Sequence, residues 1–357
     1  DSVVTMLRDK PYLVRRARGF APQQLRLPWD AVPLLATGTE LKNTFCLTRE
    51  RYAFVSHYIG DLENQETLSS FEQAIRHYER VFRIQPEALA CDLHPDYLAT
   101  HYAQARSRAE SLPLVAVQHH HAHIASCLAE NGWASPEPVI GLAYDGTGYG
   151  TDGSIWGGEI LIASYKEFTR RFHLTQLPLP GGDLAVRKPA RMALSYLLAA
   201  GIELEDQTLA PVAYLPPAEV QAVRHQARTG FNSPLTSSMG RLFDAVAALI
   251  GLCEEISYEA QAAMMLESAS DPLESGFYEM PLENDIIDPL PMIRAIVADL
   301  KASVSMGSIA ARFHNSLVRM SLEVCRQIRQ ETGLHTVAIS GGVWQNMRLM
   351  NLILPAL

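Results

Sequence analysis

Residues 114–128 read Leu-Val-Ala-Val-Gln-His-His-His-Ala-His-Ile-Ala-Ser-Cys-Leu, an apolar run followed by histidines and then by a second apolar segment. Residues 114–117 predict a buried strand, and residues 124–128 predict the body of a helix. A strand that passes directly into a helix is typical of an α/β layer. Because four histidines occupy the junction, the same stretch predicts both a fold class and a candidate site.

The histidines at this junction are typical of a metal site. On a helix, residues four apart share a face, so His119 and His123 can bind one ion. Neutral imidazole is the commonest protein ligand of transition metals. A capped helix start without metal is the other interpretation, but four histidines in five positions favour the metal. His120 is a candidate acid/base residue, or else forms a surface pair with His121, which lies off the His119/His123 face.

Strand-like and helix-like segments alternate on the N-terminal side of the histidines. Phe71, Ile75, Tyr78 and Phe82 recur at helical spacing and form one apolar stripe. Short turns predict that the three strands before this helix form a meander. The predicted strands are 2–6, 12–14, 33–36, 43–47, 52–56 and 89–93, and a second helix is predicted at 95–110.

A second lobe is predicted after the proline-rich residues 135–138. It opens like the first lobe, with a strand, a glycine-rich turn and further strands, which indicates an internal duplication. Its predicted strands are 139–143, 155–163, 171–177 and 336–339. Its predicted helices are about 187–200, 240–252, 257–268, 290–300 and 306–331, with a last one following a turn at 343.

The composition is that of an ordinary globular enzyme, with 48% apolar and 19% charged residues in 357. A net charge of −9 argues against nucleic-acid binding, because a phosphate backbone requires a basic face. The five cysteines are odd in number and lack C-x-x-C spacing, which argues against a disulfide framework and favours a reducing, cytoplasmic compartment. No apolar stretch approaches the roughly 18 residues of a membrane span.

Three glycine-bearing turns follow predicted strands, at residues 37–44, 145–150 and 340–343. Glycine in such turns allows backbone N–H groups to converge on an anion. Lys42 is a point charge suited to phosphate, and Asp145 can orient a magnesium-bound water. Each turn alone is more often a plain hairpin, and none matches the Walker or dinucleotide patterns. Together they fit an actin-like architecture that clamps phosphate between two lobes.

Several stretches carry a family resemblance in the same order along the chain. They are residues 36–44 (ATGTELKNT), 118–123 (QHHHAH), 144–150 (YDGTGYG), 156–159 (WGGE), 240–246 (GRLFDAV) and 340–346 (SGGVWQN). These stretches resemble the C-terminal half of HypF, the family of hydrogenase-maturation carbamoyltransferases. Antibiotic O-carbamoyltransferases and tRNA threonylcarbamoyl-transfer enzymes are more distant relatives, and the Leu-Lys-Asn and Gly-Arg-Leu-Phe-Asp stretches favour HypF over both.

The resemblance implies an α/β fold of two lobes, of the actin-like and sugar-kinase-like type, with duplicated strand and helix units. Residues 1–32 resemble the tail of a YrdC-like domain and a linker, residues 33–136 the first lobe, and residues 137–357 the second lobe. In the family an Asp from a closing Asn-Asp-Gly-Gly stretch supplies a third metal ligand. We expect that stretch to lie beyond Leu357, which leaves the second lobe truncated at its C-terminal end.

The resemblance also implies the site residues. His119 and His123 would bind zinc or iron, and ATP or carbamoyl-adenylate would bind with magnesium between the lobes. Lys42, His120 and Asp145 are the candidate catalytic residues. The nucleotide would contact Lys42, Asn43, Thr44, Asp145, Gly146, Thr147, Gly148, Gly181, Gly182, Gly341, Gly342 and Asn346. Asp244 is equally well explained as a residue that packs or caps a helix.

The function implied is transfer of a carbamoyl group from carbamoyl-adenylate, made from carbamoyl phosphate and ATP, to the C-terminal cysteine thiol of HypE. This reaction serves synthesis of the cyanide ligands of NiFe hydrogenase. The alternatives are transfer to a small molecule or to tRNA, a sugar or acetate kinase, and a non-catalytic nucleotide-binding module. A kinase or a binding module has no use for the histidine cluster, so metal content separates them from the carbamoyltransferase.

Overall fold

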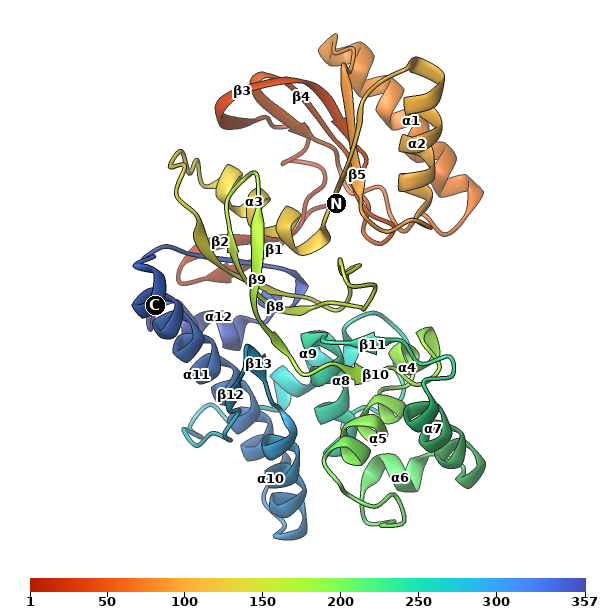
Figure 1. Ribbon diagram of the computed structural model, residues 1–357, viewed down its shortest axis with the longest axis vertical. Helices are drawn as coiled ribbons and strands as arrows, with labels where there is room; N and C mark the ends of the chain where they lie inside the picture. Colours follow the sequence, from red (N-terminus) through yellow and green to blue (C-terminus); the bar gives the residue numbers. More distant parts are fainter. The chain divides into compact units, whose positions relative to one another are not determined.

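The computed structural model describes all 357 residues and divides into two compact units, Asp1–Glu137 and Pro138–Leu357. Both are mixed α/β units, as expected (Figure 1). A membrane-crossing helix is absent, since none of the helices is both long and apolar enough.

The first unit has a four-stranded sheet in the order β4-β3-β5-β6, preceded by a separate hairpin of β1 and β2. Strands β3, β5 and β6 run parallel, and β4 pairs antiparallel with β3. The strands are β1 (Val3–Leu7), β2 (Lys10–Arg15), β3 (Leu25–Ala36), β4 (Cys46–Val55), β5 (Ala88–Asp92) and β6 (Leu114–Val117). The helices are α1 (Gln65–Phe82), α2 (Leu98–Glu110) and α3 (His119–Glu130).

The apolar stripe of α1 faces the sheet, as its spacing predicts. Phe71 and Ile75 are fully buried and join residues of β3, β4 and β5 in one core. Phe71 meets Phe45 and Tyr102 edge to face, with ring centroids 6.1 and 5.3 Å apart. Asn64 caps the helix by accepting from Thr67 N at 2.8 Å. Helices α1 and α2 lie together beside β5 in Figure 1.

The predicted three-strand meander in this unit is wrong. Strand β4 is continuous over Cys46–Val55, so residues 43–47 and 52–56 are not separate strands. The expected turn is replaced by a bulge, where Glu50 has φ +54° and pairs with Ala31 of β3. Strand β3 begins at Leu25, within the segment expected to be a linker. The prolines at 28 and 33 are tolerated because the pairing is irregular there.

The strand before the histidines was expected to be buried and is instead half exposed. Strand β6 is the last in the order of its sheet, and Val115 is 54% exposed. An apolar run of four residues does not distinguish an edge strand from a central one, because both satisfy the same pattern.

The second unit has a six-stranded sheet in the order β12-β13-β9-β8-β7-β14. Strands β7, β8 and β9 form the expected antiparallel meander, and β14 pairs parallel with β7. The strands are β7 (Val139–Tyr144), β8 (Gly158–Ala163), β9 (Phe168–Leu174), β12 (Leu282–Glu283), β13 (Ile286–Ile287) and β14 (Val337–Ser340), with a separate pair β10 (Leu177–Pro178) and β11 (Leu235–Thr236).

The predicted helices of the second unit are present, and two more lie at residues 210–229, where none was predicted. The helices are α4 (Asp183–Arg187), α5 (Pro189–Ala199), α6 (Ala210–Tyr214), α7 (Pro217–Thr229), α8 (Met239–Leu249), α9 (Gln261–Ala269), α10 (Leu290–Lys301), α11 (Met306–Thr332), the 3-10 turn η1 (Gly342–Gln345) and α12 (Met347–Ile353). Pro211 and Pro217 occupy the second position of α6 and the first position of α7, which prolines favour although they indicate breaks in a sequence. Helix α4 was not predicted either. Figure 1 shows α4 to α8 gathered beside β10 and β11.

The two units share a strand arrangement that supports the predicted duplication. In the first unit, β3 lies between antiparallel β4 and parallel β5. In the second unit, β7 lies between antiparallel β8 and parallel β14. Each unit therefore contains an antiparallel strand pair whose first strand also pairs with a later parallel strand.

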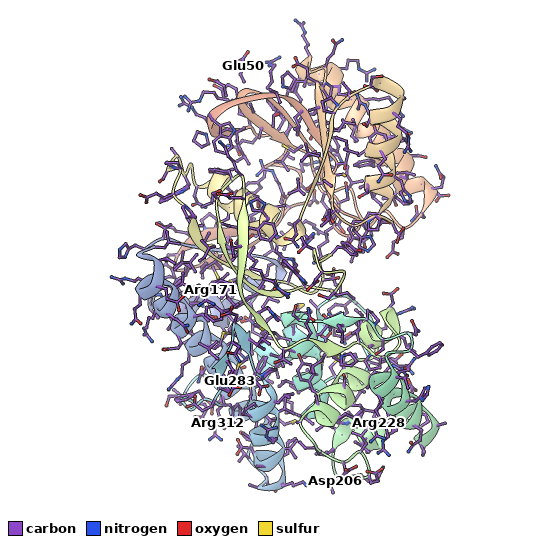
Figure 2. All side chains as sticks on the ribbon, viewed as in Figure 1. Glu50, Arg171, Asp206, Arg228, Glu283 and Arg312 are labelled. Carbon is purple, nitrogen blue, oxygen red and sulfur yellow. The ribbon has the colours of Figure 1, made fainter.

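Long-range ion pairs fasten the periphery of the second unit. Arg171 of β9 contacts Asp285 and lies 2.7 Å from Glu331 at the end of α11. Arg312 of α11 lies 2.8 Å from Asp299 and 3.0 Å from Glu274 (Figure 2). Solvent and salt screen ion pairs near the surface, so each contributes little and the apolar core carries most of the stability.

We predict that Phe71→Ala lowers the free energy of unfolding of the first unit by about 3–5 kcal/mol, because it leaves a cavity in a fully buried aromatic cluster. Chemical denaturation of the purified chain measures the change. Val81→Ala on the same helix is the control, since Val81 is 56% exposed. Equal effects of the two substitutions would contradict the assignment of this face to the core.

Candidate functional site

The start of α3 is fixed by Gln118. Its Oε1 accepts from His121 N at 2.9 Å and caps the helix, so its Nε2 must be the atom 3.2 Å from His120 Nδ1. An amide N–H can only donate, and His120 Nδ1 therefore accepts. His120 is fully buried and His121 nearly so. The expectation that these two histidines form a surface pair is wrong, because the cap turns both rings inward.

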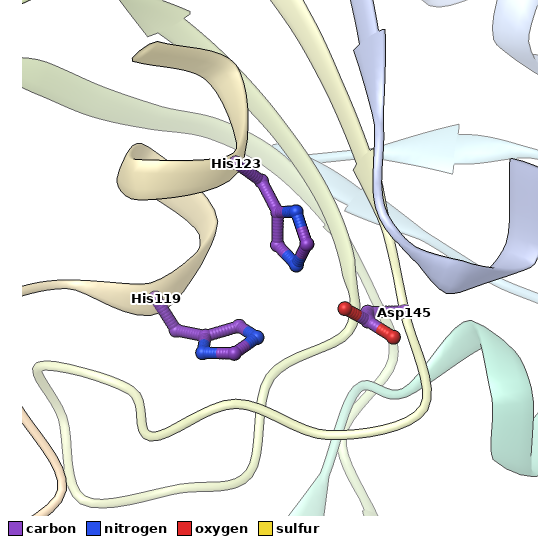
Figure 3. Close-up of side chains that lie close together, drawn as sticks. All are labelled: His119, His123 and Asp145. Atoms are coloured by element: carbon purple, nitrogen blue, oxygen red, sulfur yellow. The ribbon is translucent and has the colours of Figure 1, made fainter. Parts of the chain in front are cut away.

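His119 and His123 project from successive turns of α3 on one side of the helix (Figure 3). Their ring centroids lie 4.9 Å apart. His119 Nδ1 is 2.8 Å from Oδ2 of Asp92, a buried carboxylate at the end of β5. A carboxylate only accepts, so Nδ1 of His119 carries the proton and Nε2 has its lone pair for a metal. The two histidines thus fit a transition metal, with His119 already oriented.

Asp92 is a site residue that the sequence analysis missed. Its Oδ1 accepts from His94 N at 2.8 Å, which fixes the carboxylate while Oδ2 contacts His119. Its position at the end of a strand could have identified Asp92 from the sequence, because polar residues at the carboxyl ends of adjacent parallel strands meet at one edge of a sheet. Asp92 ends β5, and the next strand β6 ends just before the histidines.

The first glycine-bearing turn is a braced loop. Asn43 is buried, and its Nδ2 donates to the carbonyls of Thr37 and Thr39 at 3.0 and 2.6 Å. Lys42 is exposed with φ +50°, and its backbone N donates to Asp61. Thr44 is partly exposed beside them. The amide of Asn43 thus shapes the loop from inside, while Lys42 is presented outside it.

The second turn lies where several backbone segments of the second unit converge. Ser238 Oγ donates to the carbonyl of Gly146 at 2.8 Å, and Gly240 N donates to the carbonyl of Asp145 at 3.0 Å. Asp145 Oδ1 accepts from Gly146 N at 2.7 Å. The third turn joins them, since a Cβ on Gly341 would lie 2.2 Å from the carbonyl oxygen of Tyr144. Gly148 is buried and Thr147 exposed in the same loop.

A buried carboxylate, Glu159 of β8, supports this convergence. It accepts from Ser237 Oγ at 2.6 Å and from the backbone N of Gly157 at 3.1 Å. Arg170 Nε lies 2.6 Å from its Oε2, and the guanidinium covers the Trp156 ring at 4.0 Å. This pairing explains the tryptophan and glutamate of the Trp-Gly-Gly-Glu stretch, whose roles the sequence left open.

The third turn is anchored by Asn346 and His314. Asn346 Oδ1 caps α12 through Leu349 N at 2.9 Å, so its Nδ2 is the atom 3.0 Å from His314 Nε2. His314 Nδ1 then donates to the carbonyl of Ala310 at 2.7 Å. Burial lowers the pKa of this neutral histidine to about 4. Asn346, expected to contact the nucleotide, uses both side-chain polar atoms to hold the turn that carries Gly341 and Gly342.

Gly181 and Gly182 form a separate tight turn before α4, with φ of +92° and +58°. The buried Arg191 lies beneath it, donating from Nε to the carbonyl of Pro180 at 2.9 Å and pairing with Glu219 at 2.7 Å. A Cβ on Gly181 would lie 3.1 Å from this guanidinium. The tight turn itself thus requires glycine at positions 181 and 182. A role of these two glycines in nucleotide binding stays a prediction.

Both units match families of known proteins. Residues 30–130 match the HypF Kae1-like domain, and residues 141–357 match the family described as carbamoyltransferase, Kae1-like domain, second subdomain. The chain is 37% identical over 376 residues to Carbamoyltransferase HypF of Synechocystis sp., covering 100% of this chain and 48% of that protein. It is 38% identical to a Carbamoyltransferase HypF homolog of Cupriavidus necator, covering 89% and 82%.

A solved HypF structure has the same fold as this chain. A crystal structure of full-length HypF in the phosphate- and nucleotide-bound form superposes with a TM-score of 0.92 at 41% identity, covering 100% of this chain and 55% of that one. The fold and the matched segments therefore define a Kae1-like protein. The chain belongs to the HypF family of carbamoyltransferases. It spans about half the length of most of the HypF relatives it matches.

We predict that Asp92→Asn lowers the affinity of the chain for zinc by about 10- to 100-fold. The asparagine would keep its oxygen on His94 N and turn its NH₂ toward His119, which moves the imidazole proton to Nε2 and blocks the metal. Competition with a zinc chelator measures the affinity. Asp96→Asn is the control, because Asp96 is exposed nearby. An unchanged affinity in Asp92→Asn would refute the assigned tautomer.

We predict that the chain loses stability as the pH falls from about 6.5 to about 4, in part through His314. The unfolded histidine takes up a proton near pH 6.5, whereas the folded one, with its pKa lowered by burial and by Arg348, does so only near 4. His314→Gln should flatten this part of the profile of unfolding free energy against pH. His225→Gln, at an exposed position on α7, should not. Identical slopes in wild type and His314→Gln would contradict the buried neutral state.

Proposed function

We propose that this chain transfers a carbamoyl group from carbamoyl-adenylate to the C-terminal cysteine thiol of HypE. The observation that carries the proposal is the His119/His123 pair with its Asp92 support, in a chain of the HypF family. The adenylate would be made from carbamoyl phosphate and ATP, and the product would serve the cyanide ligands of NiFe hydrogenase in the cytoplasm. The HypF relative crystallised with phosphate and nucleotide supports the substrate class.

The chemistry requires an activated carbonyl and a positioned phosphate. The nitrogen lone pair of a carbamoyl group makes its carbon a poor electrophile, and the AMP leaving group compensates for this. The thiol sulfur attacks the carbonyl carbon, the bond from carbon to the phosphate oxygen breaks, and AMP leaves with a thiocarbamate formed. A bound zinc or iron would act as a Lewis acid on the carbonyl or phosphoryl oxygen.

The residues of this chain would divide the work by their chemistry. His119 and His123 would hold the metal, with Asp92 fixing the ring of His119. Lys42 would attract phosphate from its braced loop, and the backbone of residues 145–148 and 341–342 would surround the nucleotide with magnesium. Because Gln118 donates to His120 Nδ1, the proton of a neutral His120 lies on Nε2, and His120 would be the acid/base residue.

We propose that Asp145 is a catalytic residue that orients a magnesium-bound water beside the nucleotide. Oδ1 of Asp145 accepts from Gly146 N, which orients the carboxylate just after β7.

A sugar or acetate kinase remains the alternative on the same fold. The Asp92–His119 contact argues against it, because a kinase has no use for an oriented imidazole pair. A small molecule or tRNA as acceptor is the other alternative, and the net charge of −9 argues against tRNA.

We predict that the purified chain carbamoylates HypE when carbamoyl-adenylate is supplied, because the proposed metal ligands and phosphate loops all lie within it. The mass of HypE reports the product. His119→Ala and His123→Ala should abolish transfer and zinc retention, and His77→Ala, at an exposed position on α1, should not.

Two results would contradict this proposal. HypE that stays unmodified when the folded, zinc-loaded chain is given carbamoyl-adenylate would show that the chain does not transfer the group. Phosphorylation of a sugar or acetate by the chain, with HypE unchanged, would favour the kinase.

A further inference from the structure

A buried ion pair beside the Asp145 loop has no part in the site described above. Arg241 and Asp244 lie three residues apart in α8, with Nη2 of Arg241 2.9 Å from Oδ2 of Asp244. Their side chains are only 12% and 4% exposed. Burial raises the pKa of Asp244, with Arg241 acting in the opposite direction. Asp244 is therefore a partner of Arg241 rather than a helix cap.

The guanidinium of Arg241 lies against the glycine loop. A Cβ built on Gly146 would lie 3.8 Å from its Nη2, and a Cβ on Gly240 would lie 2.7 Å from the Cα of Gly146. Ser238 caps α8 by accepting from Arg241 N at 3.1 Å, and its hydroxyl also contacts the loop carbonyls. The first turn of α8 is thus docked on the loop, which places a fixed positive charge beside it.

The ion pair leaves polar atoms of both residues unsatisfied. Arg241 Nε is buried without a hydrogen-bond partner, and Asp244 Oδ2 makes no aligned hydrogen bond although the two charges are close. A buried charge with unmet donors destabilises a fold, and a pair that served packing alone would be replaced by apolar residues at little cost. A planar guanidinium beside a glycine loop, with one donor left unmet, is suited to an anion such as phosphate.

We propose that Arg241 binds the phosphate of the adenylate at the Asp145–Gly148 loop, and that Asp244 holds its guanidinium in place. The inference rests on the proposed function, because it assigns a residue to the same substrate. Arg241 would contact the leaving phosphate directly, whereas Asp244 is a positioning residue that acts through Arg241.

The test compares binding of AMP and adenosine to the full chain by isothermal titration calorimetry. Arg241→Gln should weaken AMP by about 10- to 100-fold, as loss of a charge-assisted hydrogen bond does, and change adenosine by less than about 3-fold. Arg241→Lys keeps the charge but not the planar donors, and should fall between. Arg228→Gln, on the exposed side of α7 (Figure 2), is the matched control and should bind both as wild type does.

A second variant guards against loss of folding, since Arg241→Gln leaves Asp244 buried and unpaired. Arg241→Met combined with Asp244→Leu removes both charges together, and thermal unfolding checks that it is folded. A preference for AMP over adenosine that survives in either folded variant overturns the role of Arg241 and leaves the proposed function intact. A wild-type chain that binds neither molecule overturns both.

Discussion

The backbone around Asp145 has no room for side chains at several neighbouring positions, and the second unit depends on this constraint. A Cβ on Gly157 would lie 2.6 Å from the carbonyl oxygen of Asp145, and one on Gly341 would lie 2.2 Å from that of Tyr144. Gly240 approaches the same loop from α8. Only glycine permits contacts this close. The backbones near the ends of β7 and β14 and at the start of α8 are therefore in direct contact. Glu159 and Arg170 then supply the buried charges that hold the meeting point together.

Periodicity was sufficient to predict the regular elements of both units. The stripe of Phe71 and Ile75 predicted α1, and the alternation of elements predicted the α/β class. The pattern failed where irregular pairing decided the outcome. The bulge at Glu50 turned two predicted strands into one, and prolines at 211 and 217 concealed the helices whose first turns contain them. The edge position of β6 depends on the order of strands, which no local pattern contains.

The candidate site likewise contains residues that the sequence predicted and residues that it missed. Residue type and spacing were enough to select His119 and His123, because a helix has one period. The sequence analysis did not select Asp92 and Glu159, because their partners lie far along the chain. It did not select Arg241, because its pairing with the buried Asp244 is evident only in the folded structure. Asn43 and Asn346 were selected for chemistry, yet their amides also build the loops they lie in. Sequence thus identifies candidate ligands with a local spacing more readily than residues whose role depends on the folded arrangement.

The bracing of residues 37–44 has an entropic consequence. Asn43 ties the carbonyls of Thr37 and Thr39 from within, and its backbone pairs with Gly60. Asp61 holds the main chain of Lys42 from outside the loop. The backbone of this loop is therefore already ordered, and a phosphate that bound here would require no further ordering of the main chain. Association at this loop would be limited by desolvation of one ammonium group rather than by the ordering of a flexible segment.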